Sequence, residues 1–400
     1  MEPETPRGTV DTGATRLPVF PAKEENVFLA IRDLRFAKGR FALMGGVVAL
    51  IAVLLVMLSG LTAGLGNQST SSIAQLGALH EDGTAKPVDT IAFGATGTAD
   101  PKESFTESSI TAGQIEDWAR QGGVARAEAL GISQTRLQAG KADHAGGTTN
   151  VAVFGVDPAG RLAPAPVDDK TVVLSTTAAE DLAVSTGDTV TLGGTELRVG
   201  KVVADQWYSH TSVVWTALPT WSQIAHVSDP HQVGTVAAIT YQEGAAVDEA
   251  AANQAAHTVS TSRTGAFQAL GSYQSENGSL LMMQAFLYGI SALVIVAFLT
   301  VWTIQRTRDI AVLKALGGSG GYILRDAITQ AAIVLLVGAG IGGAVGMLGG
   351  FFAAQAAPFL VNLQTTLLPI IGIIVLGLAG SAVAVRRTTK VDALIALGGN

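Results

Sequence analysis

Six polar side chains follow one face of an apolar stretch beyond the middle of the chain. They are Tyr273, Glu276, Asn277, Gln284, Tyr288 and Ser291. On a helix, at about 100° per residue, they fall within an arc of about 120°. A polar group in a membrane helix is costly when it faces lipid, so this arc should face protein or a cavity. Two interpretations remain open. The arc either joins helices to one another or forms the wall of a ligand site in the outer leaflet.

The charge pattern indicates which stretches cross a membrane. Three runs contain no Asp, Glu, Lys or Arg: 41–79, 277–305 and 327–385. An uncharged apolar run of about 20 residues is long enough to span a bilayer. The third run is divided by Pro358, Asn362, Gln364 and Pro369. The sequence therefore predicts an α-helical membrane protein with four transmembrane helices, at 41–65, 279–304, 327–352 and 367–385.

Basic residues give the predicted orientation, because cytoplasmic flanks are enriched in Lys and Arg. They precede the first span, separate the second from the third and follow the fourth: Arg32, Arg35, Lys38, Arg40; Arg306, Arg308, Lys314, Arg325; Arg386, Arg387, Lys390. The segment 66–278 then lies outside the cell membrane, as does the short loop 353–366. This segment holds 23 acidic and 11 basic residues, a net charge of −12. An acidic outer domain argues against nucleic acid as a partner.

The flanking segments have distinct compositions. Residues 1–24 are rich in Pro, Thr, Glu and Gly and are predicted to be disordered. Residues 25–40 predict a basic amphipathic helix in the lipid interface on the cytoplasmic side. Segments 305–326 and 386–400 are also predicted to be cytoplasmic. Within the first of these, Arg306–Gly317 predicts a short charged helix, a suitable docking element for a soluble partner or simply an interfacial linker.

The outer segment predicts a mixed α/β domain. Strands are expected at 151–156 and 211–215, helices at 176–184 and 218–227, and a hairpin about Gly193-Gly194. There is no cysteine, so a packed core must stabilise this domain. The six histidines, His210 among them, show no metal-ligand spacing, and His210 is interpreted as a surface histidine. No catalytic constellation and no Walker A motif occur, so the chain is predicted to be neither an enzyme nor an ATP-binding protein.

Two glycines at the end of the first span, Gly60 and Gly64, form a small-xxx-small pair. Such a pair lets two helices approach closely. It is expected to pack the first span against the same span of a second copy. The third and fourth spans are rich in Gly and Ala, which predicts tight helix packing there as well.

One span, a large outer domain and then three spans is a layout that resembles the FtsX-like, MacB-type permeases of ABC transporters. The segment Asp309-Ile-Ala-Val-Leu-Lys-Ala-Leu-Gly317 is similar to the family's ATPase-coupling segment, with Asp309 and Ala311 in place of Glu and Gly. The C-terminal Lys390-Val-Asp-Ala-Leu-Ile-Ala-Leu-Gly-Gly399 is similar to the family's Pro-x-Glu-Ala-Leu tail, with Lys390 and Asp392 in place of Pro and Glu. The turn 182–190 also resembles one in the family's outer domain.

Three further segments resemble the haem-exporting permeases of Gram-positive bacteria within this family. They are Leu58-Ser-Gly-Leu-Thr-Ala-Gly-Leu65, Tyr208-Ser-His-Thr-Ser-Val213, and Ser272-Tyr-Gln-Ser-Glu276 with Met282-Met283 and Thr303-Ile-Gln305. Together with the tail, the likeness touches most of the chain outside 1–25 and 80–150. It implies the fold of a MacB-type (type VII) ABC exporter permease that works in haem detoxification.

The resemblance also implies partners and site residues. The partners would be a second copy of the chain, two copies of an ABC ATPase, membrane lipids and haem, with haem as transported substrate and no permanent cofactor. Haem needs an apolar slot and an iron ligand. The expected wall is Tyr273, Glu276, Met282, Met283, Gln284 and Tyr288, with Glu276 as the preferred iron ligand. Tyr288 and, by its chemistry alone, His210 are the alternative ligands. The expected ATPase contacts are Arg308, Asp309, Leu313, Lys314 and Gly317. The alternatives are export of a peptide, lipid or macrolide-like drug, or FtsX-like signalling to an extracellular cell-wall hydrolase.

Overall fold

The computed structural model describes residues 38–79, 85–97, 99–140, 146–305, 312 and 320–388. The N-terminal tail, most of the amphipathic segment 25–40 and the last twelve residues lie outside the described residues. The described chain forms two compact units. The helix unit comprises the described residues up to Val56, Leu287–Met347 and the described residues from Leu367 onward. The sheet unit comprises Met57–Phe286 and Leu348–Thr366.

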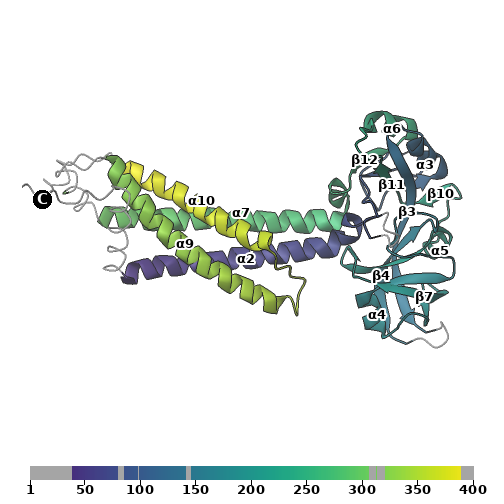
Figure 1. Ribbon diagram of the computed structural model, residues 1–400, viewed down its shortest axis with the longest axis horizontal. Helices are drawn as coiled ribbons and strands as arrows, with labels where there is room; N and C mark the ends of the chain where they lie inside the picture. The colour runs from purple at the N-terminus through teal and green to yellow at the C-terminus, as the bar shows by residue number, and fades with distance from the viewer. Residues whose placement is uncertain are drawn as a thin grey trace, which may run out of the picture. The chain divides into compact units, whose positions relative to one another are not determined.

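Four long helices carry the predicted spans (Figure 1). They are α2 (Lys38–Ala74), α7 (Gly271–Gln305), α9 (Gly320–Ala353) and α10 (Leu363–Thr388). Each contains a stretch long and apolar enough to cross a membrane. Two of them differ from the expected limits. Helix α2 continues past residue 65 to Ala74, and α7 begins at Gly271 rather than at 279. Both extra stretches belong to the sheet unit.

The helix unit is held together by close approach of its helices. Gly338, Gly342 and Gly346 follow one another at four-residue spacing on α9 and lie directly against α2. A Cβ at Gly342 would overlap the backbone of α2 at Ala49. Small residues at this spacing bring two backbones together in a bilayer, where van der Waals packing stabilises helix pairs. The tight packing predicted from the Gly content of this span is therefore confirmed.

The sheet unit contains a ten-stranded mixed sheet in the order β12-β1-β11-β3-β4-β9-β5-β7-β6, with β8 paired to β9. Strand β6 also pairs with β3, which closes β3, β4, β9, β5, β7 and β6 into a ring. The strands are β1 Thr90–Phe93, β3 Val124–Ala139, β4 Thr148–Val156, β5 Thr171–Ser175, β6 Thr189–Leu192, β7 Thr195–Val203, β8 Trp207–Tyr208, β9 Thr211–Ala217, β11 Val236–Tyr241 and β12 Val259–Ser262. A separate pair joins β2 (Ile110–Thr111) to β10 (Gln232–Gly234).

Short helices cover this sheet. They are α3 (Ala112–Ala119), α4 (Thr176–Leu182), α5 (Leu218–Ile224) and α6 (Glu249–Ala256), with the 3-10 turn η1 at Gly265–Ala269. In Figure 1, α3 and α6 lie at the β11 end of the sheet, where Trp118 is buried against Ala237 and Ile239. The side chain of Trp221 on α5 packs against Gly131 of β3 and Gly155 of β4, where a Cβ would overlap it.

Local predictions for this domain are confirmed. Strands β4 and β9 contain the expected 151–156 and 211–215, and α4 and α5 lie at the expected helices. Strands β6 and β7 form the expected hairpin about Gly193 and Gly194. Both glycines have positive φ, 54° and 88°. A two-residue turn with positive φ at both positions matches the twist of paired strands, which explains the Gly-Gly pair.

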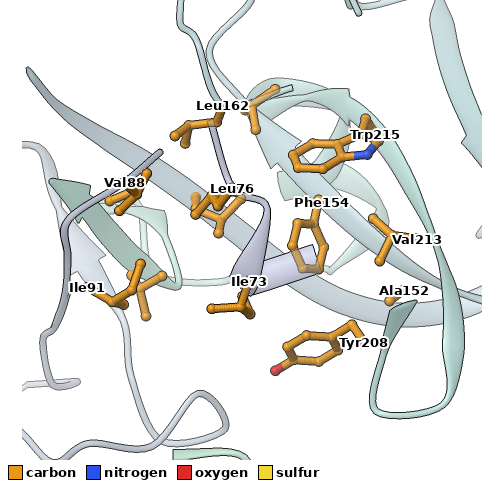
Figure 2. Close-up of a cluster of buried hydrophobic side chains, with 14 of the residues drawn as sticks. Ile73, Leu76, Val88, Ile91, Ala152, Phe154, Leu162, Tyr208, Val213 and Trp215 are labelled. Carbon is orange, nitrogen blue, oxygen red and sulfur yellow. The ribbon is translucent and has the colours of Figure 1, made fainter. Parts of the chain in front are cut away.

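The end of α2 lies in the core of the sheet unit. Ile73 and Leu76 are fully buried among Phe154, Trp215 and Tyr208 (Figure 2). The ring of Phe154 makes edge-to-face contacts with Trp215 and Tyr208 at centroid distances of 5.1 and 5.5 Å. The first span is therefore not tethered to this domain by a linker. Ile73 of α2 and Leu76 in the turn after it supply part of the domain's hydrophobic core, which is why the helix extends beyond its predicted end at residue 65.

Candidate functional site

Three polar side chains from distant parts of the sequence meet in the sheet unit. The Nε2 atom of His210 lies 2.9 Å from Oε2 and 3.1 Å from Oε1 of Glu276. The same nitrogen lies 3.1 Å from Oγ of Ser69. Ser69 is on α2, His210 is between β8 and β9, and Glu276 is in the second turn of α7. We call these three residues the Ser69–His210–Glu276 cluster.

The backbone that carries His210 is tightly constrained. Strands β8 and β9 pair at Tyr208 and Thr211, so Ser209 and His210 form a two-residue turn. Both have positive φ, 46° and 63°, a region that residues other than glycine rarely adopt. Two hydrogen bonds hold the turn on α2, because Ser209 N–H donates to Ser69 O (3.1 Å) and His210 N–H donates to Gln68 O (3.0 Å). Unusual backbone conformations held by their surroundings often occur at functional sites.

The start of α7 is attached to the same turn. The hydroxyls of Ser272 and Ser209 lie 3.1 Å apart. The ring of Tyr273 packs beside Gly66 of α2 and contacts Phe267 edge-to-face at 6.0 Å between centroids. A cleft of about 760 Å³ is bordered by Ser209 and Ser272. Glu276 remains accessible beside these contacts, since its side chain is 41% exposed and that of His210 is 30% exposed.

The predicted polar arc faces the chain's own residues in part. Glu276 binds His210, and the Gln284 side-chain amide donates to Thr62 Oγ1 of α2 at 3.1 Å. In the helix unit, Tyr288 packs on Gly372 of α10, and Ser291 is buried and donates to a carbonyl of its own helix. The arc therefore contacts neighbouring helices at Gln284 and Tyr288. At Glu276 it meets a surface turn instead.

Met282 and Met283 lie on the accessible part of α7, 61% and 49% exposed. Seven residues separate Met283 from Glu276, so the two lie on nearly the same face, about 10 Å apart along the axis. Met282 points elsewhere around the helix. Of the two methionines, Met283 is therefore placed to share a ligand with Glu276.

Gly60 and Gly64 on α2 lie against the loop between α9 and α10. The ring of Phe359 lies on Gly60, and the Pro358 carbonyl lies against Gly64. Leu360 N–H also donates to Gly60 O at 3.1 Å. Within one chain, the loop between α9 and α10 covers both glycines, and the contact between two copies of the first span stays a prediction. A small residue allows close approach of a loop as well as of a second helix, and the four-residue spacing alone does not distinguish these two partners.

The expected ATPase contacts Arg308, Asp309, Leu313, Lys314 and Gly317 all lie outside the described residues. Among the residues that are described, no group of three or more His, Cys, Asp or Glu is placed to hold a metal ion. Tyr208 is buried in the core of the sheet unit, and this burial raises the pKa of its hydroxyl. Glu276 and His210 are thus the metal-ligating side chains brought together beside α7.

The sequence predicted Glu276 as a ligand, but it interpreted His210 as a surface histidine or an alternative ligand and did not connect the two residues. His210 is 66 residues away on a different element, and no periodic pattern connects a turn to a helix. One indirect signal could have linked the two residues. The segments 208–213 and 272–276 both carry the resemblance to haem-exporting permeases.

Comparison with known proteins supports a family assignment for almost the whole described chain. Residues 41–256 match the family profile of the MacB-like periplasmic core domain, and residues 281–393 match that of the FtsX-like permease C-terminal region. Two relatives carry names that describe them as candidate hemin transport system permease proteins HrtB. The Staphylococcus epidermidis protein is 31% identical and the Staphylococcus haemolyticus protein 32% identical, each over 130 residues. The match covers 32% of this chain and 37% of each relative, so it spans little more than a third of their length.

Two solved structures are similar to parts of the chain. The periplasmic region of MacB from Actinobacillus actinomycetemcomitans aligns with a TM-score of 0.32 at 13% identity, covering 49% of this chain and 94% of that one. The extracellular domain of the noncanonic ABC-type transporter YknZ from Gram-positive bacteria aligns with a TM-score of 0.29 at 14% identity, covering 42% and 89%. Because the periplasmic core profile alone matches more than half of the 400 residues, this multi-pass membrane protein with its large extracellular α/β domain belongs to the family of MacB-type, FtsX-like permeases.

Proposed function

We propose that the protein is the permease subunit of an ATP-driven ABC exporter and that its substrate is haem. The observation that carries the proposal is the accessible carboxylate of Glu276, held at the outer-domain end of a membrane helix. An iron porphyrin requires an oxygen, nitrogen or sulfur ligand and an apolar surface for its ring. The names of the staphylococcal relatives, which refer to hemin transport, point to the same substrate.

The outer part of α7 supplies both requirements. Glu276 offers carboxylate oxygens, and Met283 lies about two turns further on the same face. Phe286 lies about 60° from Met283 around the helix and is 65% exposed, so this face presents an apolar surface to the lipid or to another chain. A flat porphyrin that entered from the outer leaflet would place its iron at Glu276 and its ring along this surface. Tyr273 and Gln284 would border the same slot, while Tyr288 would stabilise the helix.

The proposed transport cycle requires partners. A second copy of the chain would complete the slot, and two ATPase subunits would supply the energy, because the sequence contains no Walker A motif. The ATPases would dock on the segment 305–326, with Arg308, Asp309, Leu313, Lys314 and Gly317 as contacts. Closing of the ATPases would then move α7, narrow the slot and release haem to the outside.

Binding of candidate substrates to the full-length protein in lipid nanodiscs tests this proposal. Hemin should give a saturable shift of its Soret band, whereas iron-free protoporphyrin IX should bind more weakly because it lacks the ligated metal. Absence of a hemin shift, combined with stabilisation by a peptide, lipid or macrolide, would support export of that substrate instead. Recovery of a cell-wall hydrolase on the outer domain, with no hemin shift, would support a signalling role.

A further inference from the structure

We propose that His210 is the positioning residue of the substrate site, orienting the Glu276 carboxylate toward a bound metal porphyrin. This inference rests on the proposed function. An ionised carboxylate can only accept hydrogen bonds, so His210 must donate from Nε2. The distances of 2.9 and 3.1 Å from Nε2 to the two carboxylate oxygens show that one donor orients the whole group. With the carboxylate so oriented, one oxygen can turn to the iron while the other keeps the hydrogen bond.

The imidazole is suited to this task because its own position is fixed independently of α7. The two N–H bonds of the Ser209-His210 turn to α2 hold its backbone. Ser69 on α2 is fully buried, and its hydroxyl also lies within hydrogen-bond distance of His210 Nε2. Strands β8 and β9 close the turn on both sides. A donor anchored on α2 and the sheet therefore sets the direction of a ligand on α7.

Hydrogen-bond partners of metal ligands tune affinity without touching the metal. Loss of such a partner typically lowers metal affinity about 10- to 100-fold. The same reasoning makes His210 a determinant of substrate choice, because an orientated carboxylate favours a ligand that carries a metal over an apolar ligand of similar size.

The test is hemin titration of His210→Asn in the full-length protein. Asn tolerates positive φ, but its amide is too short to reach Glu276. The dissociation constant should rise about 10-fold or more, while the Soret band at saturation keeps the position of the unaltered protein, because the iron ligand is unchanged. His210→Gln, whose longer amide can donate, should recover part of the affinity. His257→Asn is the matched control, since His257 also has positive φ (48°) but caps α6 elsewhere in the domain.

Each outcome decides the inference. Equal affinities of His210→Asn and the unaltered protein overturn it and leave the proposed function intact. A displaced Soret band at saturation also overturns it, since His210 would then be an iron ligand. If the unaltered protein binds no hemin, the proposed function fails and this inference fails with it. Should His210→Asn fold poorly, His210→Gly, which suits the positive φ of this turn, replaces it with the same expected weakening, and unchanged affinity in that variant overturns the inference.

Discussion

Helices α2 and α7 both enter the sheet unit, but they do so in opposite ways. Ile73 at the end of α2 and Leu76 in the turn that follows are fully buried in the domain core. The start of α7 lies at the surface, where Glu276 and Ser272 make polar contacts with a turn. Burial of apolar side chains gives a permanent junction. Partly exposed hydrogen bonds contribute little net stability and can be exchanged. The α2 junction is thus apolar and buried, whereas the start of α7 is joined to the turn by polar, partly exposed contacts, which suits the ligand role proposed for it.

The largest effect is expected where α2 meets the core. Leu76→Ala should lower the free energy of unfolding by about 2–5 kcal/mol, because it leaves a cavity among well-packed side chains. Chemical unfolding monitored by tryptophan fluorescence measures this change, since Trp215 lies in the same cluster. Leu79→Ala is the control, because Leu79 is 43% exposed and should change little. Equal losses in both variants would show that the α2 end is not part of the core.

A second prediction tests how firmly α2 is held along its outer length. Gly64→Ala places a Cβ against the Pro358 carbonyl and should cost about 1–3 kcal/mol, as overpacking usually does. The melting temperature of the protein in detergent measures the effect. Gly46→Ala on the same helix meets no atom within 4 Å and should be neutral or slightly stabilising. A Gly64→Ala protein as stable as Gly46→Ala would contradict the loop contact.

The smallest effect is expected for the hydrogen bond that the Gln284 side chain on α7 donates to Thr62 on α2. Thr62→Val and Gln284→Leu, made singly and together, should show a coupling energy of about 0.6 kcal/mol, the average for hydrogen bonds between membrane helices. The cycle is measured by unfolding in detergent. A parallel cycle of Thr62 with Ser279 should show none, because the Ser279 hydroxyl donates to Ser275 O of its own helix. Coupling above about 2 kcal/mol would mean that α7 is fixed as firmly as α2.

The four spans were predictable because a bilayer excludes charge, and the gaps in charged residues mark the apolar runs. The limits of α2 and α7 were not. The first span was predicted to end at residue 65, yet packing of Ile73 and Leu76 in the domain core accompanies a helix that continues to Ala74. Tertiary burial outweighed local polarity at that point.

Only the residues that α7 contributes to the candidate site were predictable from the sequence. The spacing of Glu276 and Gln284 in the sequence placed both on one polar face of α7, because residues of one helix repeat at about 100° per residue. Their partners, His210 and Thr62, lie on other elements and follow from the fold alone. The covering of Gly60 and Gly64 by Phe359 and Pro358 is a long-range contact of the same kind, which spacing could not reveal.

The most direct test of the contrast between the two helices is hemin titration of Glu276→Ala in the full-length protein. Glu196→Ala, an exposed glutamate on β7, is the matched control. Glu276→Ala is expected to lose the saturable Soret shift, or to show it at another wavelength with affinity lowered at least about 10-fold, while Glu196→Ala binds as the unaltered protein does. An identical shift and affinity in Glu276→Ala would contradict the claim that the outer end of α7 is the ligand site.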